Sequence, residues 1–392
     1  MTLPGLALFY GGLVRTKNVL GTIMHSAIIL CVISIVWVLW GYSLAFAPDV
    51  GSVIGGLYWV GLKGVGLTPS PDYASTVPHQ AFMFFQLMFA AITVALITGS
   101  FAERMKFTAL LAFAVLWSTF IYSPLAHWIW GGGWMSDMGW MNDAWKGNGV
   151  LDFAGGAVVH ISCGFAALVC AIVLGKRKGY GVEPMPPGNL PMTILGAGLL
   201  WFGWFGFNAG SALAADGIAA AAFIATHIAA CAGAVSWMVA EWFHRGKPTT
   251  LGVASGIIAG LATITPCAGF VGPLSALFIG LLAGSVCYLA VVWKVKLGYD
   301  DSLDVVGIHG VGGFMGILAV GLFASIGAQG LFFGNPGQFI IQLVGAVATL
   351  IFVVVGTFII LKVVDITIGL RVSAEDEQVG LDLSQHNESA YS

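Results

Sequence analysis

The sequence has very little charge. Only 8% of its 392 residues are Asp, Glu, Lys or Arg, while 58% are hydrophobic and the mean hydropathy is +0.93. A soluble domain typically carries about 25% charged residues, so most of this surface cannot face water. The scarcity of charge therefore excludes an ordinary soluble protein. It predicts an all-α polytopic membrane protein whose partner on most sides is the lipid bilayer.

Several sequence signals of other protein classes are missing. Basic residues are never more than three in a row, which excludes nucleic acid as a partner. There is no HExxH motif and no clear serine or aspartate catalytic pair, so we do not expect an enzyme. The six cysteines form no CxxC pair and nearly all lie in apolar runs, so we expect small buried hydrophobes, with no disulfide framework, metal site or cofactor: Cys31, Cys163, Cys170, Cys231, Cys267 and Cys287.

Long uncharged runs are what the sequence has instead. A transmembrane helix needs about 20 apolar residues, and two of the runs are long enough for two helices each, broken at 265–273 and 327–338. The first run is short, and we expect the second half of a helix that starts before this numbering. The runs predict eleven spans, the first one clipped: 1–14, 18–48, 73–102, 107–136, 153–175, 184–215, 217–240, two in 248–293 and two in 305–361.

The basic residues lie almost entirely on one side of these spans. Lys63 and Lys146 alone fall in loops of the opposite side, and the other thirteen of the fifteen follow the alternation of a cytoplasmic face. Cytoplasmic loops are enriched in Lys and Arg. We therefore expect a multi-pass protein of the cell (inner or plasma) membrane, with its N-terminus outside and its C-terminus in the cytoplasm.

The first ten spans divide into two sets of five. An odd number of crossings inverts the second set relative to the first, as in many transporters. The fifth span carries Asp152 before His160, and the tenth carries Asp304 before His309. We therefore predict a five-plus-five inverted repeat around a central pore. The boundaries are a transmembrane domain over 1–371 with repeats at about 1–175 and 189–326, an extra helix at about 338–371, and a cytoplasmic tail over 372–392.

Histidines inside spans have two interpretations. Any one of them can be structural, donating to a backbone carbonyl of a neighbouring helix, and we assign that role to His25 and His227. His160 and His309 differ because each is surrounded by glycines, which let helices approach closely. Two such rings in a dry site cannot both be charged, but they can share a proton. That pair would suit a small hydrogen-bonding ligand and not a bare metal cation, which needs a cage of oxygens.

Depth within the membrane argues against such contact. At 1.5 Å per residue, His160 lies about 12 Å from the outer end of its span, and His309 lies about 8 Å from the cytoplasmic end of its own. In a hydrocarbon core of about 30 Å the rings would differ in depth by about 10 Å. We expect helix tilt, or a tenth span that starts outside the core, to close this gap.

Aromatic residues cluster near several span ends. Interfacial belts and core packing explain most of the 14 Trp and 26 Phe. The alternative is a cage of rings that holds a small cation by cation–π attraction, worth about 2 kcal/mol or more when desolvated. The residues for such a cage lie in FFQLMF, AHWIWGGGW and WFGWFGFNAGS: Phe85, Phe89, Trp130, Trp204, Phe207 and Ser211.

Together these stretches resemble the ammonium transporter (Amt/Mep/Rh) superfamily, on its Amt branch and of prokaryotic type. The resemblance rests on PGLALFYGGLVRTKNVL, AHWIWGGG, LDFAGGAVVHI, GFNAGSA, DDSLDVVGIHGVGG and GLDLSQHNESAY, which follow the family's order from residue 2 to residue 391. It implies a homotrimer with eleven spans and one pore per subunit. Ammonium, with methylammonium as its analogue, is the implied substrate.

The resemblance also implies roles for single residues. The pore histidines match His160 and His309, the outer recruitment site matches Trp130, Ser211 and Phe89, and the gate matches Phe89 and Phe207. Asp152 is implied to support the outer site. Three further residues match pore-adjacent positions: Trp204, Gln86 and Thr265. The tail GLDLSQHNESAY matches a segment that packs under the pore and communicates with PII-type signal proteins.

Two functions of different classes follow from the resemblance. The first is transport, in which an outer aromatic site captures ammonium and the twin-histidine pore conducts ammonia, with or without a separately moved proton. The second is an ammonium sensor that binds without transporting, since some Amt-like domains serve as receptors. The chain as given ends at Ser392 with no kinase or cyclase segment, which favours transport.

Overall fold

The chain folds into a bundle of long helices. The computed structural model describes residues 1–137, 139, 141 and 147–391, so Lys146 of the orientation argument lies outside the described residues. Within these residues, nine helical segments are long and apolar enough to span a membrane: Thr16–Phe46, His79–Phe101, Phe107–Trp130, Gly156–Leu174, Leu190–Ala212, Gly217–Arg245, Pro273–Leu297, Val306–Phe323 and Pro336–Thr367. Two shorter apolar helices, Thr2–Leu13 and Thr250–Ile264, lie within two of the other uncharged runs.

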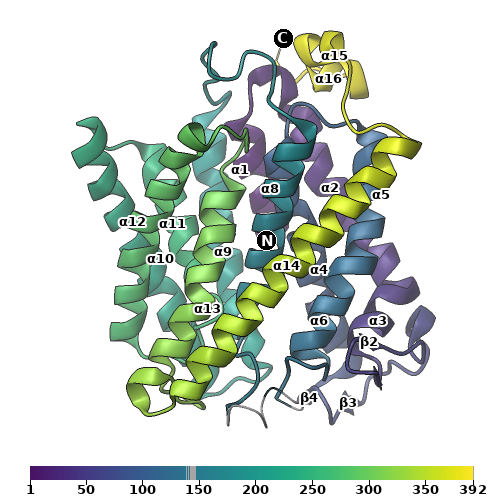
Figure 1. Cartoon of the computed structure of the whole chain (residues 1–392), viewed down its shortest axis with the longest axis vertical. Coiled ribbons are helices and arrows are strands. Elements are labelled where there is room, and N and C mark those ends of the chain that lie inside the picture. Colours follow the sequence, from purple (N-terminus) through teal and green to yellow (C-terminus); the bar gives the residue numbers. More distant parts are fainter. Residues whose placement is uncertain (138, 140, 142–146, 392) are drawn as a thin grey trace.

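The helices of the first half gather on one side of the bundle (Figure 1). The sequence order brings α1 and α2 together first, and α3 to α6 follow around the same side. Most bounds agree with the uncharged runs because hydrophobic length sets them. The helices are α1 (Thr2–Leu13), α2 (Val19–Val36), α3 (Tyr42–Phe46), α4 (His79–Phe101), α5 (Phe107–Trp117), α6 (Ser123–Trp130) and α8 (Ser162–Leu174).

The second half forms the other side of the bundle. α14 runs obliquely across both halves in Figure 1 and ends near the tail. The predicted break at 265–273 separates α11 from α12, as expected from its proline and glycine content. The helices are α9 (Leu190–Asn208), α10 (Gly217–Arg245), α11 (Thr250–Ile264), α12 (Pro273–Leu297), α13 (Val311–Phe323) and α14 (Pro336–Thr367).

The predicted span over 73–102 begins later in the structure than its uncharged run. Residues 73–102 were expected to be helical throughout, but the structure begins α4 at His79 and places the preceding residues in a hairpin. Pro78 explains the boundary, because it precedes the first helical residue and has no N–H to donate within a helix. Two small antiparallel hairpins lie between α3 and α4 at one end of the bundle: β1 (Asp49–Val50) with β2 (Ile54–Gly55), and β3 (Pro69–Ser70) with β4 (Ala74–Pro78).

Both histidines of interest lie in short π-helical turns. The turn η5 (Gly156–Ile161) precedes α8 and holds His160, and η7 (Val306–Gly310) precedes α13 and holds His309. In each case the histidine is the last residue but one of the turn, and a 13-residue α-helix follows. π-turns occur mostly as single insertions, frequently at functional sites. The two segments therefore have matching local structure in the two halves.

These two helices begin side by side and run to opposite ends of the molecule (Figure 1). A Cβ built on Gly164 would lie 2.1 Å from the Gly310 nitrogen, and one on Gly313 would lie 2.6 Å from the His160 Cβ. The glycines therefore permit the close approach predicted from sequence. The expected depth gap of about 10 Å is closed, since the Nδ1 atoms of His160 and His309 lie 3.1 Å apart. The gap closes because η5 and η7 both begin among buried residues in the interior of the bundle.

The acidic residue that matches Asp152 is Asp301, and the pairing with Asp304 was wrong. Asp152 precedes its histidine by eight residues, and so does Asp301. The Asp152 carboxylate accepts from backbone amides of η5, and the Asp301 carboxylate accepts from the Val306 amide of η7 at 2.8 Å. Asp304 instead forms an ion pair with Lys294. The shared spacing of eight residues is the sequence signal for this correspondence.

The tail packs against the same end as the basic loops. It forms α15 (Ala374–Val379) and α16 (Leu381–His386), which lie together at one end in Figure 1. The buried Asp382 carboxylate accepts from the Leu20 and Gly21 amides at 3.0 and 2.7 Å, which caps the start of α2. Glu377 is also buried and pairs with Arg371 at 2.7 Å. The tail is therefore a docked element, as the resemblance implied.

Candidate functional site

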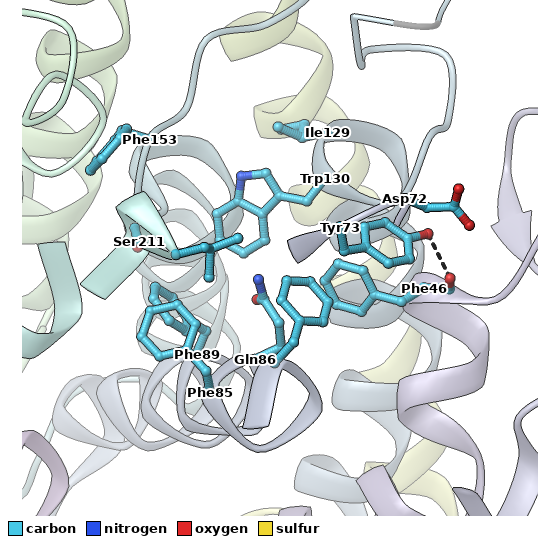
Figure 2. Close-up of a pocket in the computed structure, with 12 residues that line it drawn as sticks. Phe46, Asp72, Tyr73, Phe85, Gln86, Phe89, Ile129, Trp130, Phe153 and Ser211 are labelled. Atoms are coloured by element: carbon cyan, nitrogen blue, oxygen red, sulfur yellow. Dashed lines mark hydrogen bonds between the residues drawn. The ribbon is translucent and has the colours of Figure 1, made fainter. Parts of the chain in front are cut away.

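A cavity of about 260 Å³ is lined by residues of α3, α4, α6 and the segment around β3. In Figure 1, β3 and α6 lie at the end of the bundle opposite the tail. Figure 2 shows its lining side chains, which come from α3, α4, α6 and the segments around β3, Phe153 and Ser211. Most are aromatic, so the wall offers ring faces with few charges. The lining residues are Phe46, Asp72, Tyr73, Phe82, Phe85, Gln86, Phe89, Ile129, Trp130, Phe153, Ser211 and Leu213.

The polar atoms of this cavity are mainly acceptors. The Ser211 hydroxyl donates its proton to the Phe207 carbonyl at 2.8 Å, which leaves its oxygen lone pairs free to accept. Among the described residues, the buried Gln86 Oε1 has no hydrogen-bond partner. Asp72 contributes an exposed carboxylate. Rings and acceptors together favour a small cation that donates hydrogen bonds.

A column of rings leads inward from the cavity. Phe89 lies edge-on to Trp130, with ring centroids 5.6 Å apart, and contacts Phe207 at 4.5 Å. Phe207 is followed by His160 at 6.3 Å. Phe89 is 2% exposed and Phe207 7%, so the two phenylalanines close the inner end of the cavity. The predicted gate residues are therefore in contact, and they lie between the outer cavity and the histidines.

His160 and His309 form the inner part of this column. Their Nδ1 atoms are 3.1 Å apart and their ring centroids 5.1 Å apart, with planes inclined by 20°. One Nδ1 must carry a proton that the other accepts. Both rings are buried, and within the described residues the His160 Nε2 has no partner. The pair can therefore offer both a donor and an acceptor to a small ligand.

Trp204 and Thr265 hold the His160 ring in place. The Trp204 indole stacks on His160 with centroids 5.6 Å apart and planes inclined by 17°. Its N–H donates to the Thr265 hydroxyl oxygen at 2.9 Å, and that hydroxyl donates in turn to the Leu261 carbonyl at 2.7 Å. These two hydrogen bonds satisfy the polar side-chain atoms of Trp204 and Thr265 and fix the plane of the indole. Both residues therefore act on the column by positioning it.

Asp152 connects the outer cavity to the histidine helix. Its carboxylate accepts from four consecutive amides at the start of η5, those of Gly155, Gly156, Ala157 and Val158. Its own carbonyl accepts from the Trp130 indole N–H at 2.8 Å. Gly155 has a φ of +115°, which a residue with a side chain rarely adopts. One buried aspartate thus fixes both Trp130 and the turn that carries His160.

On the side of the histidines away from the outer cavity, the column is narrow and apolar. A space of about 10 Å³ beside His309 is lined mostly by aliphatic and aromatic side chains, which is room for about one water-sized molecule. A bare ion there would lack ligands, since no charged side chain lines this space. The lining residues are Leu6, Phe9, Tyr10, Leu96, Leu200, Trp204, Ile258, Leu303, Ile308 and His309.

All ten predicted site residues lie along this column or support it. Sequence reasoning missed Asp72 and Tyr73, which line the outer cavity. Tyr73 donates to the Phe46 carbonyl at 2.6 Å, drawn as a dashed line in Figure 2. The uncharged run predicts a span that begins at Tyr73, directly after Asp72, whereas both residues precede α4 in the structure. A tyrosine and an aspartate just before Pro78 were the available signal.

The histidines assigned structural roles lie away from the column. His25 is buried beside Phe107, with ring centroids 6.3 Å apart. His227 stacks on Trp201 on an exposed face of α10. His127, also outside the pair, contacts the Ala45 carbonyl and the Asp49 carboxylate at 2.9 and 2.8 Å. His127 and His227 have local partners, whereas the buried His25 Nδ1 has no hydrogen-bond partner among the described residues.

Known proteins resemble this chain over its whole length. A model of the Ammonium Transporter Family matches residues 1–391. The ammonium transporter of Bacillus subtilis is 54% identical over 99% of this chain and 94% of its own length, and ammonium transporter Amt1 of Archaeoglobus fulgidus is 46% identical over 100% and 95%. Among solved structures, Saccharomyces cerevisiae Mep2 has a TM-score of 0.86 at 37% identity, covering 95% of this chain and 84% of its own. A protein titled "Sensor Amt Protein" reaches 0.89 at 28%, covering 98% and 94%.

Proposed function

This chain belongs to the ammonium transporter family, and on that premise we propose that it conducts ammonium across a membrane through the column between Trp130 and His309. The observation that carries the proposal is the continuity of the column. An acceptor-lined aromatic cavity, a phenylalanine pair and a hydrogen-bonded histidine pair follow one another at ring spacings of 4.5 to 6.3 Å.

The outer cavity captures ammonium as a cation. The faces of Trp130 and Phe89 attract its charge, and the oxygen lone pairs of Ser211 accept its N–H groups. The unpartnered Gln86 Oε1 offers a second acceptor. A hydrated cation loses water on entering an aromatic cavity, and these oxygens replace part of that loss.

Ammonium loses a proton before it passes the phenylalanines. The charged form cannot cross the apolar constriction of Phe89 and Phe207, but neutral ammonia can. Ammonia then exchanges hydrogen bonds with His160 and His309, which supply an acceptor and a donor without becoming charged. Potassium has no proton to give up and meets too few oxygens. The proton either crosses separately through the histidine pair or returns outward, which gives electrogenic or neutral transport.

The arrangement in the membrane follows from the same premise. The nine long and two shorter apolar helices supply eleven spans, arranged as five plus five inverted spans with repeats at about 1–175 and 189–326. The N-terminus is outside and the tail over 372–392 is in the cytoplasm, because the basic loops lie at the tail's end. The assembly is a homotrimer in the cell membrane, and the docked tail is the surface for a PII-type signal protein.

Currents and uptake in proteoliposomes test transport. We expect saturable current or methylammonium uptake with the intact protein, and none with potassium in place of ammonium. The His160→Ala, His309→Ala double variant should lose ammonium selectivity or flux. Comparable potassium current in the intact protein would contradict the proposal, and the current at matched uptake separates the electrogenic from the neutral form.

A sensor is the second candidate. The structure titled "Sensor Amt Protein" has the same fold at 28% identity, so the fold alone does not separate the two roles. A sensor would bind ammonium with saturation while liposome uptake stayed at the level of protein-free controls. Uptake above that level supports transport.

A further inference from the structure

Cys163 brings a sulfur to the histidine pair. It follows His160 by one helical turn on α8 and is fully buried. Its sulfur and one nitrogen of each of His160 and His309 all lie within 4.8 Å of one another. Within the described residues, the thiol donates a weak hydrogen bond to the His160 carbonyl at 3.6 Å. The pore therefore contains a compact set of two nitrogens and one sulfur.

This donor set suits soft metal ions. Thiolate and imidazole ligands select Cu(I), Zn(II) and similar ions over Mg(II), Ca(II) and the alkali cations, which require oxygens. Typical distances are about 2.0–2.1 Å from metal to imidazole nitrogen and about 2.3 Å to thiolate sulfur, as for Zn(II). Two nitrogens now 3.1 Å apart need to separate by only about 1 Å to bind one ion between them.

Charge decides which soft ion fits. The surroundings are buried and apolar, so an uncompensated charge is costly there. One thiolate and two neutral imidazoles carry a single negative charge, which a monovalent cation neutralises. A divalent ion would leave a net positive charge on this cluster. The Asp301 carboxyl is close enough to act on the Cys163 thiol, but it already interacts with Lys294 and accepts from the Val306 amide. The site therefore favours a monovalent soft cation of the Cu(I) type over Zn(II) or Hg(II).

The proton count follows from the ligands. The Cys163 thiol loses its proton when the sulfur–metal bond forms. The proton shared between the two Nδ1 atoms moves to the Nε2 of the ring that held it, so both rings stay neutral and both Nδ1 atoms bind metal. Nothing is oxidised or reduced. One proton is released for each monovalent ion bound.

We propose that His160, Cys163 and His309 form a binding site for a monovalent soft metal ion, and that an ion bound there blocks the pore. The block rests on the proposed transport function, because an ion held by both Nδ1 atoms leaves both Nε2 atoms protonated, and the pair then offers ammonia no acceptor. The binding itself does not depend on that function.

Two other cysteines must be removed before binding is measured. Cys31 is exposed, and the Cys231 sulfur lies 3.7 Å from the His227 Nε2 on the surface of α10. Both could bind metal independently of the pore. A Cys31→Ser, Cys231→Ser protein serves as the parent. Cys170→Ser on this parent is the matched control, because Cys170 is equally buried on the same helix but outside the cluster.

Silver(I) in chloride-free buffer, kept in the dark and free of reductants, is the probe, since it is monovalent, soft and, unlike Cu(I), not oxidised by air. We expect the parent and its Cys170→Ser variant to bind one ion per chain, with a sulfur-to-silver absorption band and release of one proton. Cys163→Ser should weaken binding by more than the roughly 10–100-fold typical of losing a metal's supporting group. Equal binding by parent and Cys163→Ser would overturn the site, and so would a divalent ion binding more tightly.

The block is measured in proteoliposomes at silver concentrations that fill the site. Without silver, parent, Cys163→Ser and Cys170→Ser should all take up methylammonium at similar rates. With silver, uptake should fall at least tenfold in the parent and in Cys170→Ser, and remain in Cys163→Ser. Uptake that persists in the silver-loaded parent would overturn the block. Absent uptake before silver is added would instead contradict the transport proposal, while the binding results would stand.

Discussion

Single residues fix the position of the His160 ring. Thr265→Val keeps the size of the side chain but removes the oxygen that accepts from the Trp204 indole. A buried N–H without a partner costs about 1–3 kcal/mol, so we expect a lower unfolding temperature and reduced methylammonium uptake. Thr265→Ser, which keeps the hydroxyl, should behave like the unmodified protein. If Thr265→Val also matched the unmodified protein in both measurements, the indole hydrogen bond would have no role in positioning His160.

The Asp152 carboxylate supports four amides at once. Asp152→Ala leaves these amides without acceptors in a buried site, and we expect a loss of at least about 3 kcal/mol. Asp152→Asn keeps one carbonyl oxygen and should lose less. Thermal unfolding of the detergent-solubilised protein measures the order, with uptake as a second readout. Equal stability of the two variants would mean that the amides find other acceptors.

Asp301 predicts a pH dependence of stability. Burial raises its pKa to about 6, Lys294 partly offsets this and Asp304 adds to it. The unfolded chain ionises this carboxyl near its ordinary pKa of about 3.9, so the folded protein holds the proton more tightly. Stability should therefore increase as the pH falls from about 6 to about 4, by about 2–3 kcal/mol from this group.

Comparing the unmodified protein with its Asp301→Asn variant isolates the contribution of Asp301 to stability. The amide can still accept from the Val306 N–H, but it does not titrate. The unfolding temperature of Asp301→Asn minus that of the unmodified protein should be highest above pH 6 and should fall toward pH 4. A difference that stays constant with pH would show that Asp301 ionises normally in the folded protein.

At the scale of elements, the close crossing of the two histidine helices depends on glycine. Gly164→Ala would place a methyl group 2.1 Å from the Gly310 backbone nitrogen, which cannot move independently of η7. Overpacking of this kind typically costs about 1–3 kcal/mol, and it should also separate the rings. We expect lower stability and lower uptake.

Gly198→Ala is the control for this change. It lies within α9, and a Cβ there has no neighbour within 4 Å. Alanine is favoured over glycine inside a helix by about 0.5–1 kcal/mol, so this variant should be as stable as the parent or slightly more so. If the two alanine variants behaved alike, the contact between the helices would not limit packing.

The elements differ in how well sequence predicts them. Hydrophobic length specified most spans, because a helix in lipid must satisfy its own backbone and cross a fixed thickness. It could not specify where η5 and η7 begin, because that depends on Asp152 and Asp301 accepting amides deep in the interior. The ring contacts of His160 join three segments, η5, α9 and η7, and a single sequence without a family pattern would leave its role open.

At the scale of the whole molecule, the tail joins the two ends of the chain. The Leu381 amide donates to the Asn18 side chain at 2.8 Å, and Asp382 accepts from two amides at the start of α2. These contacts are reciprocal caps, since each segment supplies an acceptor for the backbone of the other. Docking of α16 is therefore energetically linked to the first turn of α2.

Asp382→Ala should release the tail and loosen the start of α2 together. Hydrogen bonds to a charged group contribute about 1.5–3 kcal/mol each, so amide exchange over 374–391 should become at least tenfold faster, and the Leu20 and Gly21 amides should follow. Hydrogen–deuterium exchange followed by mass spectrometry measures both segments in one experiment. Glu388→Ala, in the same tail but exposed, should leave both unchanged. Faster exchange in the tail with unchanged exchange at α2 would show that docking and the cap are independent.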